Sequence, residues 1–249
     1  VLLSVGGGTA GATKMLDAVT ADPDTRARFI ENTMMLVYLY SLDGIDVDWE
    51  YPTAANSEIF ADVIHELAGR LHAEGRLLSI AVSADGWHGQ YYPDAALQDA
   101  DFLNIMAYDD GYGVTPPIPH SSYWFARSAL DYWLVTRLVP PWKANLGVPF
   151  FGRSLKDRHS ISYARLRKMD SRASASDVSG EFGYNGFDTL RAKTVNLARA
   201  RAGGIMIWQL NQDAHGSDSL LNAIFDAIKE PIEPMLVAGE GAAPVSAVE

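Results

Sequence analysis

A run of alternating acidic and apolar residues, DGIDVDWEYP, occupies positions 43–52. Because side chains alternate between the two faces of a β-strand, Asp46, Asp48 and Glu50 would share one face. The other face would carry only large apolar side chains. Burying neighbouring carboxyl groups is unfavourable and raises their pKa values. A strand that gathers three such groups on one face is therefore typical of a functional site.

A solvated edge strand would also place acidic residues on one face. The opposite face of this run is too apolar for an exposed loop, and Gly44 and Pro52 bound it as they would a strand between packed elements. We therefore expect a buried strand whose acidic face opens into a site.

The composition is that of one large globular domain. Its 249 residues, 48% of them hydrophobic, match the usual length of a single α/β barrel. The net charge of -11 argues against nucleic acid or an anionic membrane as partner. The absence of cysteine excludes disulfides and thiol catalysis. No membrane span or signal peptide is recognisable, and no metal or cofactor is expected.

Apolar strands alternate with helical patterns along the chain, which favours βαβ units and a parallel sheet. Besides the acidic run, strands are expected at 1–7, 77–85, 101–109, 144–153 and 203–210. Helices are expected at 23–40, 56–75, 121–138, 188–201 and 220–228. The pattern alone leaves open whether the sheet is a barrel or doubly wound, although no GxGxxG motif supports a nucleotide-binding version.

Two segments lack a strong periodic pattern. Residues 155–184 are expected to be irregular, with one short helix at 163–169. From Pro231 the composition changes to Pro, Ala, Gly, Glu and Val, which predicts a tail or linker. The expected organisation is therefore a domain at 1–230 and a tail at 231–249.

The acidic run resembles the DxxDxDxE signature of glycoside hydrolase family 18, the chitinase family. Asp43, Asp46, Asp48 and Glu50 fill its four fixed positions. Three shorter motifs follow the order of the same family. These are SVGG, with Ser4, Gly6 and Gly7; the MxYD motif, with Met106, Tyr108 and Asp109; and a tryptophan in the last strand, Trp208.

The resemblance implies a (β/α)8 TIM-barrel fold. SVGG belongs to the third barrel strand in this family, so the barrel is expected to be incomplete at its N-terminal end, with about six βα units present. The connection 153–186 is too short and polar for the α+β insertion of many processive members. This predicts a shallow, open cleft and endo-type or short-substrate action.

The resemblance also implies an enzyme that hydrolyses β-1,4-linked N-acetylglucosamine polymers with retention of configuration. Asp48 and Glu50 would lie on the same side of the substrate and could not flank the bond, as the usual pair of carboxylates does. The substrate's own acetamido group would then be the nucleophile. Glu50 would be the general acid and base, Asp48 would stabilise the oxazolinium ion, and Asp46 would pair with Asp48.

The remaining motif residues receive binding or structural roles from the resemblance. Tyr108 would orient the acetamido carbonyl, Asp109 would hydrogen-bond the sugar, and Trp208 would stack on it. Taken alone, Met106, Tyr108 and Trp208 could be core residues, and Asp109 a helix cap. Structural roles are expected for Asp43, Ser4, Gly6 and Gly7. Further sugar stacking is expected of Trp87 and Tyr112, with Tyr91 and Tyr92 as candidates, whereas Trp124 is expected to pack in its helix.

Two other functions share the motif. One is an endo-β-N-acetylglucosaminidase acting on N-glycan cores, and the other is a non-catalytic chitin-binding lectin. Retention of Glu50 favours catalysis over the lectin. A barrel without its first strands could also be an inactive fragment. The expected partner is a polysaccharide or oligosaccharide containing N-acetylglucosamine, which predicts a secreted, periplasmic or cell-surface location.

Overall fold

The computed structural model describes residues 1–111 and 118–230. Six parallel strands form its main sheet, in the order β1-β2-β3-β4-β5-β10. These strands are β1 (Leu2–Gly6), β2 (Gly44–Asp48), β3 (Leu77–Ser83), β4 (Phe102–Met106), β5 (Ala144–Pro149) and β10 (Gly204–Trp208). The predicted parallel sheet is confirmed within these residues. Tyr112 and the predicted tail at 231–249 lie outside them.

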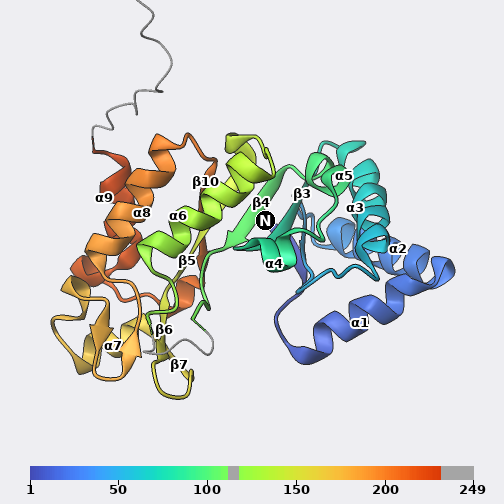
Figure 1. Cartoon of the computed structure of the whole chain (residues 1–249). Helices are drawn as coiled ribbons and strands as arrows, with labels where there is room; N and C mark the ends of the chain where they lie inside the picture. Colours follow the sequence, from blue (N-terminus) through green and yellow to red (C-terminus); the bar gives the residue numbers. More distant parts are fainter. Residues whose placement is uncertain (112–117, 231–249) are drawn as a thin grey trace, which may run out of the picture.

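The helices flank this sheet in two groups (Figure 1). The first group is α1 (Ala10–Ala21), α2 (Pro23–Leu39), α3 (Ser57–His72) and α5 (Asp94–Asp99), at the right of the view. The second is α6 (Tyr123–Asp131), α8 (Phe187–Arg199) and α9 (Leu220–Ile228), at the left. Shorter helical elements are the single turn α4 (Gly86–Gly89), a π-turn at Tyr132–Thr136, and 3₁₀ turns at Pro141–Lys143, Ala173–Ala175, Leu210–Gln212 and Gly216–Asp218.

The first helical region differs from the expectation in two ways. Helix α1 was not predicted, because it has no side-chain cap and buries few of its residues. Helix α2 begins at Pro23 as predicted, where the Asp22 carboxylate accepts two backbone N–H groups. Its buried residues are Ile30, Thr33, Met34 and Val37. Leu36 and Tyr40 fit the same helical spacing in the sequence, but both are exposed.

The apolar face of the acidic run lies in the core as predicted. Ile45 and Trp49 have no exposed surface, and Val47 retains only 3%. The Trp49 ring packs edge-on against Phe60 of α3, with 5.7 Å between ring centroids. Burying such side chains contributes about 1.5–3 kcal/mol each to stability, so this packing holds β2 firmly with its acidic face turned away from the core.

The segment after β5 forms a second, smaller sheet. The predicted strand 144–153 is broken at Phe150, whose N–H donates to the Trp208 carbonyl at 2.8 Å. The chain continues as β6 (Phe151–Ser154), β7 (Ser160–Ser162), β8 (Val178–Ser179) and β9 (Phe182–Gly183), in the antiparallel order β7-β6-β9-β8. The predicted short helix is confirmed as α7 (Tyr163–Met169).

The expectation of an irregular 155–184 connection is therefore wrong. Strands of two to four residues are too short to show the alternation by which a strand is recognised. The small sheet and α7 project from the lower left of Figure 1. The prediction of a shallow, open cleft assumed that the 153–186 connection forms no additional structure. The small sheet and α7 remove that assumption.

Within residues 1–111 and 118–230, no helix combines the length and the apolar composition needed to cross a bilayer.

Candidate active site

A cavity of about 1130 Å³ opens at the carboxyl ends of the main-sheet strands. This is the edge at which parallel α/β sheets place their ligands. Segments after β1, β2, β3, β4, β6 and β10 all contribute. Its lining includes Gly7, Gly8, Asp48, Glu50, Tyr51, Ser83, Asp85, Trp87, His88, Met106, Tyr108, Asp109, Asp110, Phe125, Arg153 and Trp208.

Asp48 ends strand β2, and Glu50 follows two residues later on the same side of the chain. The Asp48 carbonyl accepts the Gly7 N–H at 2.7 Å, and the Glu50 carbonyl accepts the Thr13 hydroxyl at 2.5 Å. Two glycines permit this close approach. A Cβ at Gly6 would lie 2.0 Å from the Asp48 carbonyl oxygen, and one at Gly8 would lie 2.9 Å from Glu50 Oε1. The SVGG motif therefore makes room for the acidic residues.

Asp46 lies two residues before Asp48 on the same face of β2. Residues of β1, β3 and β4 hydrogen-bond to its side chain. Its carboxylate accepts hydrogen bonds from Ser4 at 2.8 Å, from Ser79 at 2.5 Å and from Asn104 at 3.1 Å. The predicted structural role of Ser4 is thus to anchor Asp46. Asp46, which these neutral donors hold in place, raises the pKa of Asp48 through its negative charge.

Burial and neighbouring charges raise the pKa values of both Asp48 and Glu50. Burial, followed by the charges of Glu50 and Asp46, raises the pKa of Asp48 to about 7. Burial also raises the pKa of Glu50, and the charge of Asp109 raises it further. Hydrogen bonds with Tyr51 and Asp48 partly offset this rise. The two carboxyl groups share a hydrogen bond, so they titrate as a pair.

Tyr108 faces this acidic pair from strand β4. Burial and the charges of Asp48 and Glu50 raise the pKa of its phenol well above the usual value, so it remains a hydrogen-bond donor. Its hydroxyl lies 4.0 Å from the sulfur of Met206. Met106 also lines the cavity but is only 7% exposed, which makes it mainly a packing residue.

Asp109 lies on the opposite wall from β2 and carries a fixed negative charge. Arg153 of β6 donates from Nε to Oδ1 at 2.6 Å and from Nη2 to Oδ2 at 2.7 Å. Burial alone would raise the pKa of Asp109, but its contacts with His120 and Arg153 outweigh burial and hold the pKa well below its usual range. Asp109 is therefore ionised wherever the protein is folded near neutral pH.

The aromatic predictions divide into three outcomes. Trp208 and Trp87 line the cavity, with 49% and 75% of their surfaces exposed. Tyr92 has no exposed surface and packs on Phe60 and Trp133, so the expectation that it stacks on sugar is wrong. Trp124 does not line the cavity, and although it is 67% exposed it contacts Tyr123 and Arg127 of its own helix, as expected. Tyr91 does not line the cavity.

Asp43 lies at the other end of β2, where its carboxylate accepts a hydrogen bond from the amino group of Val1. Its backbone N–H and carbonyl continue the pairing with β1 and β3. This position, far from the acidic pair along the strand, agrees with the expected structural role.

Several lining residues were not predicted from the sequence. Tyr51 directly follows Glu50, hydrogen-bonds to it, and stacks on His88 with 4.4 Å between ring centroids. Arg153 lies in a segment that was predicted as a plain strand. His120 is buried behind the lining, and no pattern around it marks a site. Only Tyr51 had a usable signal, since it follows the motif directly. Among the described residues, no cluster of three metal-ligating side chains is present.

The arrangement can move a proton to and from a bound molecule. A buried carboxyl pair of raised pKa, a protonated phenol and an exposed tryptophan meet in one cavity, which suits general acid–base chemistry on a ligand with an apolar face. The fold and site thus define a class, the α/β enzymes that carry out acid–base chemistry at the carboxyl ends of parallel strands.

Comparison with known proteins gives the family. The family model of glycosyl hydrolases family 18 matches residues 1–213, so this chain belongs to that family. Chitotriosidase-1 of Mus musculus is 27% identical over 85% of this chain and 58% of its own length. The chain therefore spans little more than half of that relative.

Two solved structures have the same fold. A family 18 chitinase from the chitin utilization locus of Flavobacterium johnsoniae is 30% identical, with a TM-score of 0.83 over 91% of this chain and 74% of its own. A chitinase-like agglutinin from Robinia pseudoacacia is 23% identical, with a TM-score of 0.75 over 91% and 80%. The main sheet is accordingly part of a (β/α)8 barrel, six of whose strands lie in the described residues, as the resemblance predicted.

Proposed function

We propose that this protein hydrolyses β-1,4-linked N-acetylglucosamine polymers, with retention of configuration and the substrate's acetamido group as nucleophile. The main support for this proposal is the hydrogen-bonded pair of Asp48 and Glu50 in the cavity, both of which have raised pKa values. Family membership and the similarity to chitinases support the choice of substrate.

Glu50 is the general acid and then the general base. A general acid must be protonated near the working pH, which burial beside a negative charge favours. In the first step Glu50 gives its proton to the glycosidic oxygen as the C–O bond breaks. In the second step the ionised Glu50 takes a proton from the water that attacks the anomeric carbon, and the bond from that carbon to the acetamido oxygen breaks.

The acetamido carbonyl oxygen forms the new bond to the anomeric carbon in the first step. Both carboxyl groups come from one strand end, so neither lies across the sugar ring as an enzymic nucleophile would. Asp48 accepts a hydrogen bond from the acetamido N–H and stabilises the positive oxazolinium. Its Oδ1 has no hydrogen-bond partner among the described residues. Tyr108 donates to the acetamido oxygen and holds it in line for attack.

The other wall binds the sugar. Trp208 offers a half-exposed ring at the end of β10, suited to the apolar face of a pyranose. Asp109 supplies a fixed acceptor for sugar hydroxyl or amide groups. A polymeric substrate of this kind is met outside the cell, so we also propose an exported protein.

Hydrolysis of fluorogenic diacetylchitobioside by the wild type and by Glu50→Gln tests the proposal. We expect the variant to lose about 10³-fold in kcat while it still binds chitooligosaccharides, because general acid–base catalysis contributes about 10²–10⁴-fold. Equal rates would refute the role of Glu50. Binding without hydrolysis by the wild type would indicate a lectin, and cleavage restricted to a high-mannose glycopeptide would indicate an endo-β-N-acetylglucosaminidase. Proton NMR of the first product should show the β-anomer, and the α-anomer would overturn the mechanism.

A further inference from the structure

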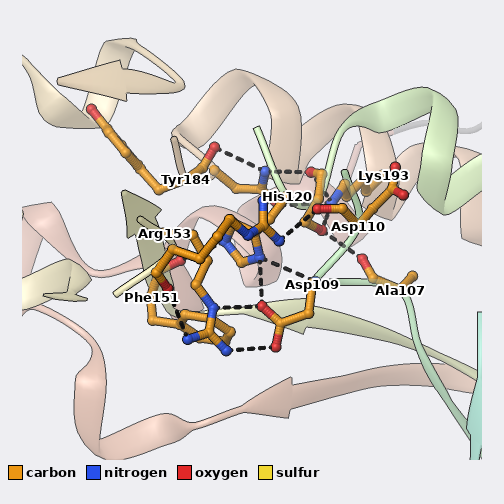
Figure 2. A network of polar contacts seen from close by, with 11 residues as sticks. Ala107, Asp109, Asp110, His120, Phe151, Arg153, Tyr184 and Lys193 are labelled. Atoms are coloured by element: carbon orange, nitrogen blue, oxygen red, sulfur yellow. Dashed lines mark hydrogen bonds and ion pairs between the residues drawn. The ribbon is translucent and has the colours of Figure 1, made fainter. Parts of the chain in front are cut away.

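A buried lysine lies behind the Tyr108–Asp109 wall without lining the cavity (Figure 2). Lys193 of α8 is 1% exposed. Its Nζ donates to the Ser121 carbonyl at 2.8 Å, to the Ser121 hydroxyl at 2.7 Å and to Asn185 Oδ1 at 2.7 Å. These bonds use all three hydrogen atoms of the ammonium group. No carboxylate in the described part of the chain lies within ion-pair distance of Nζ.

Such a lysine is unfavourable for folding. Burial lowers its pKa to about 7, although the charge of Asp177 partly offsets that effect. An apolar residue on this buried face of α8 would avoid the desolvation cost. The reason for a lysine therefore lies in the groups that it holds, and these are mainly the two oxygen atoms of Ser121.

Residues 120 and 121 in turn fix the backbone of 107–110 at three points. The Ser121 hydroxyl donates to the Ala107 carbonyl at 2.6 Å, and the Asp110 N–H donates to the His120 carbonyl at 2.9 Å. The Asp109 N–H donates to His120 Nδ1 at 3.2 Å. The same ring also reaches β6, since His120 Nε2 lies 3.2 Å from the Phe151 carbonyl oxygen, and its Nδ1 lies 3.4 Å from Asp109 Oδ1.

The segment needs such support because its conformation is not one that an isolated chain prefers. Asp109 has a φ of 63°, in the left-handed region that non-glycine residues seldom adopt. Local strain of this kind persists only where surrounding contacts hold it. The Tyr108 phenol and the Asp109 carboxylate project from this segment into the cavity.

We propose that Lys193 is a positioning residue of the active site, which holds Ser121 and thereby fixes residues 107–110 with Tyr108 and Asp109. The expected effect of Lys193 on turnover rests on the proposed function, whereas its effect on the position of residues 107–110 does not. It assigns no contact between Lys193 and substrate. A displacement of about 1 Å at a positioning group can cost about 10²-fold in rate, so a residue outside the cavity can control turnover.

The main test compares Lys193→Met with Thr194→Val as the matched control. Thr194 is the next residue of α8 and is equally buried, but its hydroxyl donates to the Leu190 carbonyl of its own helix. On chitooligosaccharides, assayed below the melting temperature of every variant, we expect Lys193→Met to lose about 10- to 100-fold in kcat, with KM within about threefold. Thr194→Val should stay within twofold in kcat, and an equal loss in both variants would overturn the proposal.

A double-mutant cycle with Ser121→Ala tests the route of the effect. If Lys193 acts through Ser121, the double variant should lose no more kcat than the stronger single variant. Losses that multiply would show that Lys193 acts elsewhere, against the proposal. Should Lys193→Met fail to fold, Ser121→Ala carries the test, since it removes one oxygen atom and leaves no large cavity.

Amide hydrogen exchange separates this inference from the proposed function, because it requires no substrate. The N–H groups of Asp109 and Asp110 should exchange faster in Lys193→Met and in Ser121→Ala than in Thr194→Val. Faster exchange in a protein whose wild type hydrolyses nothing would support the positioning role and reject the enzyme. Exchange at 109–110 that is unchanged in both variants would overturn the positioning role, whatever the activity.

Discussion

The two walls of the cavity carry carboxyl groups that their surroundings treat in opposite ways. On the β2 wall, burial and neighbouring negative charges raise the pKa of Asp48 to about 7 and also raise that of Glu50. On the β4 wall, His120 and Arg153 outweigh burial and hold the pKa of Asp109 well below its usual range. Asp48 and Asp109 are the same residue type in the same cavity, so the partners decide the behaviour.

The two walls are therefore suited to different tasks. The β2 wall has raised pKa values and can bind and release protons near neutral pH. The β4 wall keeps a charge that does not change in that range, held by a bidentate arginine. A substrate between them meets one wall that reacts and one that positions. Variants of Asp48 and Asp109 should therefore fail in different ways.

The largest expected effect follows from Asp48→Asn. The asparagine keeps the shape but cannot stabilise a positive oxazolinium or exchange a proton with Glu50, so kcat should fall about 10²–10³-fold. Steady-state rates on chitooligosaccharides across pH 4–9 would check this, and the alkaline limb should also move. A variant with wild-type kcat would remove Asp48 from the mechanism and erase the difference between the walls.

The same substitution should stabilise the fold at high pH. Folded Asp48 keeps its proton up to about pH 7, whereas the unfolded chain loses it near the ordinary pKa of 3.8. The folded state thus binds more protons across that interval and loses stability as pH rises through it. Asp48→Asn removes this loss, so its unfolding free energy should exceed that of the wild type above pH 7 by up to about 4 kcal/mol.

Urea unfolding at pH 4 and pH 8 measures that effect. The advantage of Asp48→Asn should be large at pH 8 and nearly absent at pH 4. Asp131→Asn, on the exposed face of α6, is the control and should change the free energy by less than about 0.5 kcal/mol at both pH values. An advantage of equal size at both pH values would show that packing, and not ionisation, separates the variants.

The β2 wall was predictable from the sequence, and the reason is local. Asp46, Asp48 and Glu50 belong to one strand, so alternation alone places them on one face, and the buried Ile45 and Trp49 confirm it. The parallel sheet was predictable for the same reason. Apart from the alternating β2, its strands are mainly apolar segments of five to seven residues, and helical patterns separate them along the chain.

The β4 wall was only half predictable, because it is assembled from distant segments. Tyr108 and Asp109 end a recognisable strand, but Arg153 lies 44 residues further on and His120 lies 11 further. Arg153 reaches Asp109 only because β5 breaks at Phe150 and β6 turns into the small sheet. No local pattern signals that break, so neither the sheet nor the ion pair could be derived.

A smaller loss is expected from Asp109→Asn, about 10- to 150-fold in kcat/KM, since one charge-assisted hydrogen bond to substrate contributes about 1.5–3 kcal/mol. The asparagine cannot form the bidentate pair with Arg153. Because the Asp109 charge contributes to the raised pKa of Glu50, the alkaline limb should move toward lower pH, but by less than in Asp48→Asn. A pH–rate profile tests this directly, and a limb that moves as far as in Asp48→Asn would mean that both walls titrate together.

The smallest effect is expected from Trp208→Ala, which removes a stacking surface and no charge. Stacking of this kind contributes about 0.5–1.5 kcal/mol beyond burial, so KM should rise about three- to tenfold while kcat changes little. Trp87→Ala is the matched comparison, because that ring also lines the cavity but is 75% exposed against 49% for Trp208. Its KM should rise by less than about twofold. If instead Trp208→Ala lowered kcat tenfold at constant KM, the ring would act in the transition state, and positioning would then extend from the β4 wall to β10.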